Sequence, residues 1–316
     1  MSSVESPYTR LLKAVRSAVV SLLLFICACS PSQGQHQGEQ PFIFGILTDV
    51  HYADKESNHY RFYRTALRKL DECVADLNRR RPAFVIQLGD IVDGDRDNVD
   101  ELVTDLDSVL QVYNGLMAPK YHVVGNHCLL VGEEVLRQKL HMERFYYDFS
   151  VPSVEGWRFV VLDGNATKDV VTGRAQLEWF RSTLDKAARN GEKVICFCHY
   201  PLLEAAAARH RMMANPEPFL KAMDDAHCVA AWFAGHYHAG GYAIRNGVHH
   251  VTLKAMIEAP VHTAYALIEL HADRIREIGI GSEPSRDLPL EPRESALKTE
   301  RPAEPDVPAR ADKPGR

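Results

Sequence analysis

Short apolar runs alternate with longer amphipathic segments from about residue 41 to residue 190. HYRFYRTALRKLDECVADLNRR has apolar residues at 60, 63, 67, 70, 74 and 77, the spacing of a helix. Further helices are predicted near 98–117, 132–141 and 174–190. Strands are predicted at FIFGILT, PAFVIQLGD, KYHVVGN and EKVICFCHYP, and near 145–149 and 157–163. Such alternation predicts parallel βα units.

The pattern changes after EKVICFCHYP. Closely spaced strands are predicted at CVAAWFAGH, GYAIR, VHHVTLK, AYALIEL and RIREIGI. Arg245-Asn246-Gly247 supplies a hairpin turn between two of them, so we expect antiparallel pairing here. Together the two halves predict a mixed α/β domain over residues 41–281, with its strands in one sheet or two. Residues 282–316 are rich in proline and charge and poor in core residues, which predicts a disordered tail.

The N-terminal segment reads differently from the rest of the chain. Arg10, Lys13 and Arg16 precede an apolar run, Ala18 to Ala28, that suits a secretory signal peptide. The run ends in ICACS, which resembles the lipobox of bacterial lipoproteins, with Cys29 as the lipidated residue. We therefore expect a signal peptide over 1–29, a flexible tether over 30–40, and an exported lipoprotein on the periplasmic or outer surface of a bacterium. A plain signal peptide or an uncleaved anchor is the alternative.

Composition narrows the class of partner. The 316 residues are 46% hydrophobic and 25% charged, which is typical of a soluble domain. The net charge of −5 provides no general attraction to nucleic acid or to anionic lipid, so membrane contact is expected only through the lipid anchor. Five cysteines remain beyond the signal segment, an odd number that argues against a complete disulfide framework but leaves one bridge open. They are Cys73, Cys128, Cys196, Cys198 and Cys228.

Potential metal ligands follow the ends of the predicted strands. In parallel α/β sheets the carboxyl ends of the strands are where sites assemble, so residues distant in sequence can converge. Carboxylates, imidazoles and one carboxamide suit Mn²⁺, Fe or Zn²⁺. In chain order the elements are Asp49-x-His51, Gly89-Asp90, Gly125-Asn126-His127, His199 and Gly235-His236-x-His238.

The order D-x-H, G-D, G-N-H, H, G-H-x-H resembles the calcineurin-like metallophosphoesterase superfamily. That resemblance implies a two-sheet β-sandwich flanked by helices, in four αββα layers. It also implies two divalent metal ions, Mn first, with Fe or Zn as alternatives, and hydrolysis by hydroxide that the metals supply. His127 would lie beside the phosphate and stabilise charge or protonate the leaving oxygen. The implied ligands are Asp49, His51 and His238 for one metal, Asn126, His199 and His236 for the other, and Asp90 for both.

A finer resemblance concerns the substrate. FGILTDVHYAD, RFYR, VIQLGDIVDG and GHYHAGGYAIRNGVHHVTLKAMIEAP are similar to the manganese-dependent ADP-ribose/CDP-alcohol diphosphatase family. This implies a phosphorylated small molecule, a nucleotide diphosphate, as substrate. Two positions depart from the animal members: His51 stands where they carry glutamine, and Cys128 where an acidic residue follows GNH. A phosphomonoesterase, a cyclic-nucleotide phosphodiesterase and a lipid-anchored non-catalytic binding protein are the alternatives.

The cluster NHYRFYR at 58–64 has two interpretations. Arg61 could contact a phosphate and Tyr63 could stack on a base. Alternatively, both tyrosines continue the apolar stripe into the core, while the arginines pair with acids, as Arg68 can with Glu72. Alternation along the strand allows at most one histidine of GVHHV to face the site, and Glu258 is expected to be structural.

Overall fold

The computed structural model describes residues 41–58, 60–93, 98–166 and 170–290. They form two six-stranded sheets. The first runs in the order β12 (Arg286–Pro289), β11 (Arg274–Gly281), β10 (Ala264–Leu270), β1 (Phe42–Leu47), β2 (Val85–Gln87) and β3 (Lys120–His122). The second runs in the order β4 (Tyr147–Phe149), β5 (Trp157–Leu162), β6 (Lys193–Cys198), β7 (Val229–Ala234), β9 (Val248–Thr252) and β8 (Gly241–Arg245).

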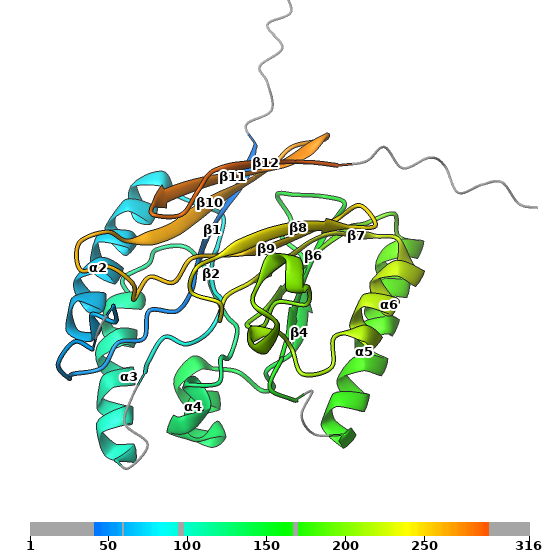
Figure 1. The fold of residues 1–316 in the computed structure, drawn as a ribbon. Coiled ribbons are helices and arrows are strands. Elements are labelled where there is room, and N and C mark those ends of the chain that lie inside the picture. Colours follow the sequence, from blue (N-terminus) through cyan, green and yellow to red (C-terminus); the bar gives the residue numbers. More distant parts are fainter. Residues whose placement is uncertain (1–40, 59, 94–97, 167–169, 291–316) are drawn as a thin grey trace, which may run out of the picture. The chain divides into compact units, whose positions relative to one another are not determined.

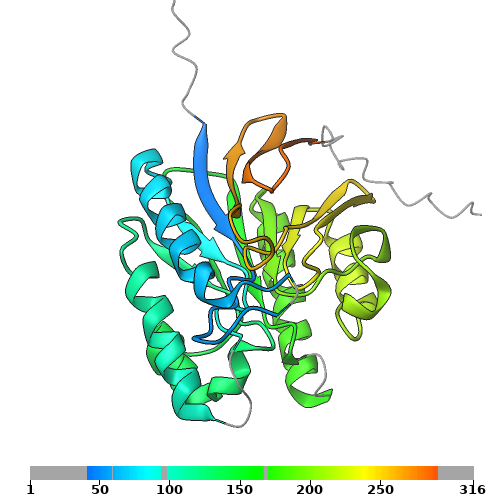
Figure 2. The ribbon, with the colours of Figure 1, turned by 60° about the vertical axis from the view of Figure 1, so that its left-hand side comes forward.

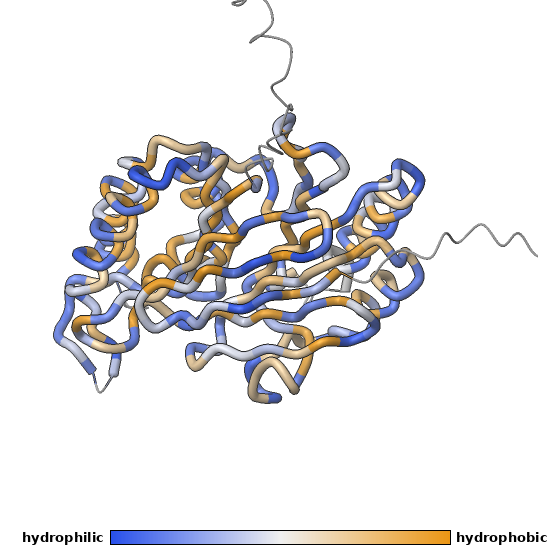
Figure 3. The backbone as a smooth tube through the Cα atoms, turned by 90° about the horizontal axis from the view of Figure 1, so that it is seen from above, coloured by the Kyte–Doolittle hydropathy of each residue, from blue (hydrophilic) through white to orange (hydrophobic). Residues whose placement is uncertain are grey.

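Helices cover the outer face of each sheet, which confirms the predicted αββα layers (Figure 1). The helices α2 (Tyr63–Arg80) and α3 (Val99–Tyr113) pack on the first sheet, and α5 (Val170–Arg189) and α6 (Glu217–Ala226) pack on the second. Figure 2 shows the two helical layers on opposite sides of the strands. Hydrophobic and hydrophilic residues alternate along the helices, as one buried face requires (Figure 3).

Alternating side chains fill the space between the two sheets. Phe44 and Phe159 point inward and meet with ring centroids 5.8 Å apart in an edge-to-face contact. The residues next to them in sequence, such as Val160, point outward to the helices. All five cysteines named above are buried free thiols in the structure.

Three local expectations need correction. Strand β7 pairs parallel with β6, because α6 provides a crossover that the sequence pattern did not reveal. It also pairs parallel with β9, because β8 lies between them in the chain and pairs with β9 at the edge of the sheet. Strand β12 lies within the segment predicted as a disordered tail; it pairs antiparallel with β11, so the folded part extends to residue 290 rather than 281. Helix α2 begins only at Tyr63, because the preceding residues make backbone contacts with the loop after β9.

The two chain ends carry predictions that the structure does not address. The predicted signal peptide, lipidation at Cys29 and the tether fall in residues 1–40, outside the described residues. The rest of the predicted tail, 291–316, also lies outside them. Among the helices that the structure does describe, none is both long and apolar enough to cross a bilayer.

Candidate metal centre

The predicted ligands converge at the carboxyl ends of strands from both sheets. Two groups of side chains each bring one ligand atom per residue within 4.8 Å of the others: Asp49, His51 and His238, and Asp90, His199 and His236. The Asp90 Oδ2 atom lies 3.0 Å from His199 Nε2 and 3.6 Å from His51 Nε2, so it faces both groups. The geometry therefore brings six of the seven predicted ligands together, all except Asn126, with Asp90 facing both groups.

The donor atoms fit a cation. Asp49 Oδ1 and His51 Nε2 are buried and have no hydrogen-bond partner among the described residues. They lie 3.4 Å apart, and His238 Nε2 is also 3.4 Å from Asp49 Oδ1. Burying such polar atoms without partners costs free energy. A metal ion bound by all three would compensate that cost.

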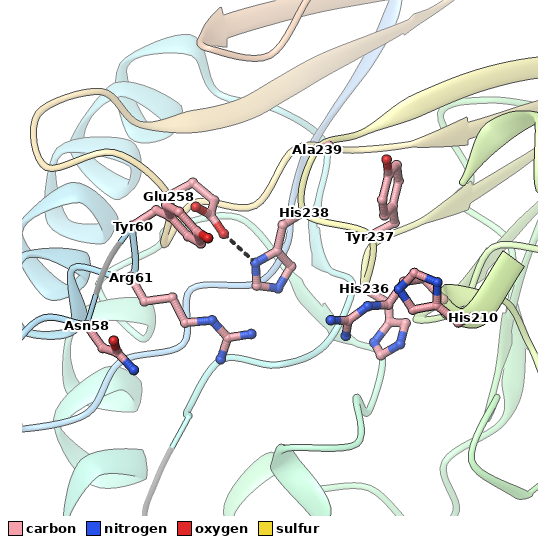
Figure 4. A pocket seen from close by; sticks show the side chains of 10 residues that line it. Asn58, Tyr60, Arg61, His210, His236, Tyr237, His238, Ala239 and Glu258 are labelled. Carbon is pink, nitrogen blue, oxygen red and sulfur yellow. Dashed lines mark hydrogen bonds and ion pairs between the residues drawn. The ribbon is translucent and has the colours of Figure 1, made fainter. Parts of the chain in front are cut away.

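Hydrogen bonds behind the imidazoles direct their Nε2 atoms toward the centre. His199 Nδ1 donates to the backbone oxygen of Leu88 over 2.8 Å. His51 Nδ1 lies 2.8 Å from Asp93 Oδ1, and His238 Nδ1 lies 2.8 Å from Glu258 Oε1 (Figure 4). Such partners fix the ring and raise its basicity as a ligand.

Sequence reasoning missed both of these carboxylates. Asp93 stands in the quoted GDIVDG block, three residues after Asp90, but no metal-ligand pattern singles it out. It is only 5% exposed and also pairs with Lys55 and Arg61. Glu258 was expected to be structural; its contact with His238 makes it part of the site.

The backbone at the centre is strained. Asp49, His51, Asp90 and His236 have φ angles of 51°, 45°, 51° and 63°, in the left-handed region that side chains disfavour. Hydrogen bonds between the loops hold these conformations: Asp49 N donates to Gly89 O, and His51 N donates to Asp90 O. Non-glycine residues in such conformations cluster at functional sites.

The electrostatics are dominated by the buried carboxylates. Burial by itself lowers the pKa of His199, but Asp90 and Asp49 raise it to about 9. Burial likewise opposes protonation of His238, yet Asp49 and Glu258 raise its pKa to about 9. The same negative field attracts divalent cations, whose binding requires neutral imidazoles. The centre is therefore one in which metal ions can replace protons.

Two further predicted site residues lie at the edge of the centre. His127 donates its backbone N–H to Asp90 Oδ1 over 2.8 Å, and its Nδ1 lies 3.2 Å from the backbone oxygen of Asp93. Its side chain is 24% exposed. Asn126 accepts a hydrogen bond from Tyr200 and lines a cavity together with His236.

Two cavities open beside the centre and meet at His210 and His236. The first measures about 340 Å³ and is also lined by Tyr60, Arg61 and His238, among others. The second measures about 480 Å³ and includes Asn126, Asn165 and Tyr200 in its lining. Figure 4 shows Arg61 and His236 reaching toward the same space from opposite sides.

Of the two predicted substrate residues, Arg61 lies in the first cavity and Tyr63 does not. Tyr63 is 5% exposed and packs in the core, so its predicted contact with a base is wrong. The reason is its position in the first turn of α2, on the apolar stripe. Tyr60, which precedes the helix, is 70% exposed and lines the cavity instead. His249 and His250 line neither cavity.

Comparison with known proteins identifies the family. The model of the calcineurin-like phosphoesterases matches residues 42–240. The chain belongs to this family. A manganese-dependent ADP-ribose/CDP-alcohol diphosphatase of rice is 30% identical to this phosphoesterase, covering 80% of this chain and 96% of the relative. The human protein of that name is 26% identical over 81% of this chain and 95% of its own length.

A solved structure agrees with the sequence relatives. A dimetal phosphatase from Danio rerio superimposes with a TM-score of 0.73 at 26% identity, covering 80% of this chain and all of that one. The phosphoesterase described here is thus a metal-dependent phosphoester hydrolase of a family that uses two divalent ions, and the named relatives point to manganese. The predictions of family, fold class, enzyme class and metals are confirmed.

The predicted location is contradicted by the same relatives. They come from plants and animals, including rice, Arabidopsis thaliana and humans. The prediction of an exported bacterial lipoprotein was wrong because it depended on an apolar run and a single cysteine, Cys29. That pattern is far less specific than a similarity that covers about four fifths of the chain.

Proposed function

We propose that this phosphoesterase hydrolyses the phosphoanhydride bond of nucleotide diphosphates of the ADP-ribose or CDP-alcohol type. The observation that supports this most is the pair of cavities that meet at His210 and His236, beside the candidate metal centre. A diphosphate with a substituent on each phosphate has two arms that leave the reacting group in different directions. A phosphomonoester has one. The names of the relatives support the same substrate class.

In this proposal the chain's own residues divide the work of binding. Asp49, His51 and His238 would hold one ion, Asn126, His199 and His236 would hold the other, and Asp90, which faces both groups, would serve both. When bound, the ions supply Lewis-acid polarisation of phosphoryl oxygens and activation of water. Asp93 and Glu258 keep His51 and His238 in the orientation in which Nε2 faces the centre.

His127 supplies proton chemistry. Its Nδ1 faces the backbone oxygen of Asp93, an acceptor only, so the proton of the neutral ring lies on Nδ1 when this bond forms. Its Nε2 is then the atom that takes up or releases a proton in the partly exposed edge of the site. A second proton on Nε2 can be donated to the leaving phosphate oxygen. This role is in keeping with general acid catalysis.

A hydrolysis panel with Mn²⁺ tests the substrate class. It compares ADP-ribose, CDP-choline, a cyclic nucleotide and p-nitrophenyl phosphate at equal concentrations. We expect both diphosphates to give the highest kcat/KM. A preference for p-nitrophenyl phosphate or for the cyclic nucleotide over both diphosphates would overturn the proposal.

The His127→Ala variant tests the assigned chemistry. We expect it to bind Mn²⁺ with the same stoichiometry as the wild type and to lose about 10²- to 10⁴-fold in kcat, the usual contribution of a general acid. Metal analysis and turnover are measured on the same preparation. Full turnover on every cleavable substrate would show that His127 has no part in proton transfer.

A further inference from the structure

A short segment between β6 and α6 contributes His210 to the lining of both cavities. It contains the one-turn 3₁₀ helices Glu204–Ala206 and Arg209–Arg211. The second turn is closed by a hydrogen bond from Arg211 N to Ala208 O over 2.8 Å, and Met213 N, just after it, donates to Pro201 O over 2.9 Å. Met213 itself is buried in the core beneath α6. The side chains of the second turn are therefore presented from a fixed backbone.

Arg211, in the second turn, brings a positive charge to the first cavity. It is exposed and lines the first cavity together with Arg61, His236 and His238. Among the described residues its guanidinium group has no hydrogen-bond or ion-pair partner. Arg61 reaches the same cavity and uses one nitrogen, Nη1, for Asp93. Each guanidinium has five N–H donors, so both retain donors for a ligand.

Two guanidinium groups and one carboxylate, that of Glu258, line this cavity. Arg211 lines this cavity beside His236, and Arg61 lines it beside His238. Two arginines next to a centre for two dications repel whatever cation binds there. An anionic group in the cavity would remove that repulsion and engage both guanidinium forks.

We infer that Arg211, together with Arg61, binds the second phosphate of a diphosphate substrate, the one that is not attacked. Arg211 is thereby a specificity-determining residue for diphosphates over monoesters. This inference rests on the proposed function, since it assigns a binding role within the same site. A monoester has its single phosphate at the metal ions and leaves the two arginines without a ligand.

Substitution of Arg211 tests the inference, with Arg209 as the matched control. Arg209 has the same charge, lies on the same helical turn and is exposed, but it lines neither cavity. For Arg211→Ala we expect kcat/KM on ADP-ribose and CDP-choline to fall about 10- to 100-fold, the range for hydrogen bonds to a charged group. On p-nitrophenyl phosphate the change should stay below about threefold. Arg209→Ala should be neutral on all three substrates.

A binding readout separates recognition of the phosphate from damage to the site. Inorganic diphosphate should inhibit hydrolysis of p-nitrophenyl phosphate less well in Arg211→Ala, whereas inhibition by inorganic phosphate should not change. Arg211→Lys keeps the charge but not the fork, and should recover part of the loss. Mn²⁺ content equal to that of the wild type shows that the centre itself is intact.

The outcomes distinguish this inference from the proposed function. If the wild type does not hydrolyse diphosphates, the proposed function fails, whatever Arg211 does. If the wild type hydrolyses them and Arg211→Ala loses equally on diphosphates and p-nitrophenyl phosphate, or loses nothing, the role of Arg211 is refuted while the function stands. An equal loss of kcat/KM in Arg209→Ala would mean that any nearby positive charge has this effect, and would also refute the specific role of Arg211.

Discussion

Glu258 is not a predicted metal ligand, but replacing it should weaken metal binding through its hydrogen bond to the ligand His238. Glu258→Gln keeps an oxygen near His238 Nδ1 but removes the charge, and Glu258→Ala removes the acceptor altogether. Loss of such a partner usually weakens metal binding 10- to 100-fold. The hydrogen bond is 2.8 Å long, but the Glu258 side chain is 31% exposed, so water screens the charge. We therefore expect about tenfold weaker Mn²⁺ binding in Glu258→Gln, about 1.4 kcal/mol, and about 30-fold in Glu258→Ala.

Calorimetric titration of the metal-free protein with Mn²⁺ measures this directly. The weakened step should belong to one ion, since His238 groups with Asp49 and His51 only. Activity at saturating Mn²⁺ should return close to that of the wild type, because the ligands themselves remain. Glu72→Gln, which alters a surface pair with Arg68, serves as the control. Equal affinity in Glu258→Ala and the wild type would refute the assignment of Glu258 as the partner of a metal ligand.

Two further predictions concern residues near the centre, and a third concerns a buried carboxyl on β11. A Cβ at Gly125 would lie 2.1 Å from Asp90 Oδ1, so Gly125→Ala should displace that carboxylate and lower kcat/KM at least about 100-fold; wild-type kinetics would contradict the geometry. Lys69, buried in α2, donates to backbone oxygens of the loop that carries Glu258. Lys69→Met should lower the free energy of unfolding by about 2 kcal/mol in urea melts, and an unchanged midpoint would speak against this anchor. Burial and a neighbouring carboxylate raise the pKa of Glu277 above 4.5, so the native state keeps a proton that the unfolded chain has lost. The stability that this proton provides is lost as pH rises through the native pKa; Glu277→Gln should flatten the decline between about pH 5 and 8, and an unaltered slope in urea melts would disprove it.

Much of the centre could be predicted because its donors stand at strand ends. Asp49, Asp90 and His199 each follow an apolar strand in the sequence. Parallel pairing brings the carboxyl ends of β1 and β2 together, and β6 ends at the same place in the other sheet. The types of these residues and their order along the chain were therefore enough to predict the ligands. The parallel pairing of β7 with β6 was missed because the sequence indicates it only through the short helix α6 after Pro216. Strand-like patterns lie on either side of this helix, so its apolar residues did not stand out.

Asp93 and Glu258 could not be found in the same way. Their roles depend on which ring nitrogen of His51 and His238 faces the centre, and that is set by contacts across 42 and 20 residues of sequence. Tyr60 shows the same limit on a smaller scale. Tyr60 has the helical spacing of Tyr63, but the helix begins only at Tyr63, so Tyr60 lies outside it and is exposed. Hydrophobic periodicity predicts on which face of a helix a residue would lie, but not where the helix begins.

Four of the predicted ligands have backbone conformations that cost free energy. Glycine would adopt the φ angles of Asp49, His51, Asp90 and His236 more easily, but it offers no donor atom. Each non-glycine residue in this region costs about 1–3 kcal/mol, which the surrounding structure must offset. The bonds that join the two strand-end loops, Asp49 N to Gly89 O and His51 N to Asp90 O, tie the strained residues to one another. The conformation of the loop after β1 is therefore stabilised by the loop after β2, and the reverse.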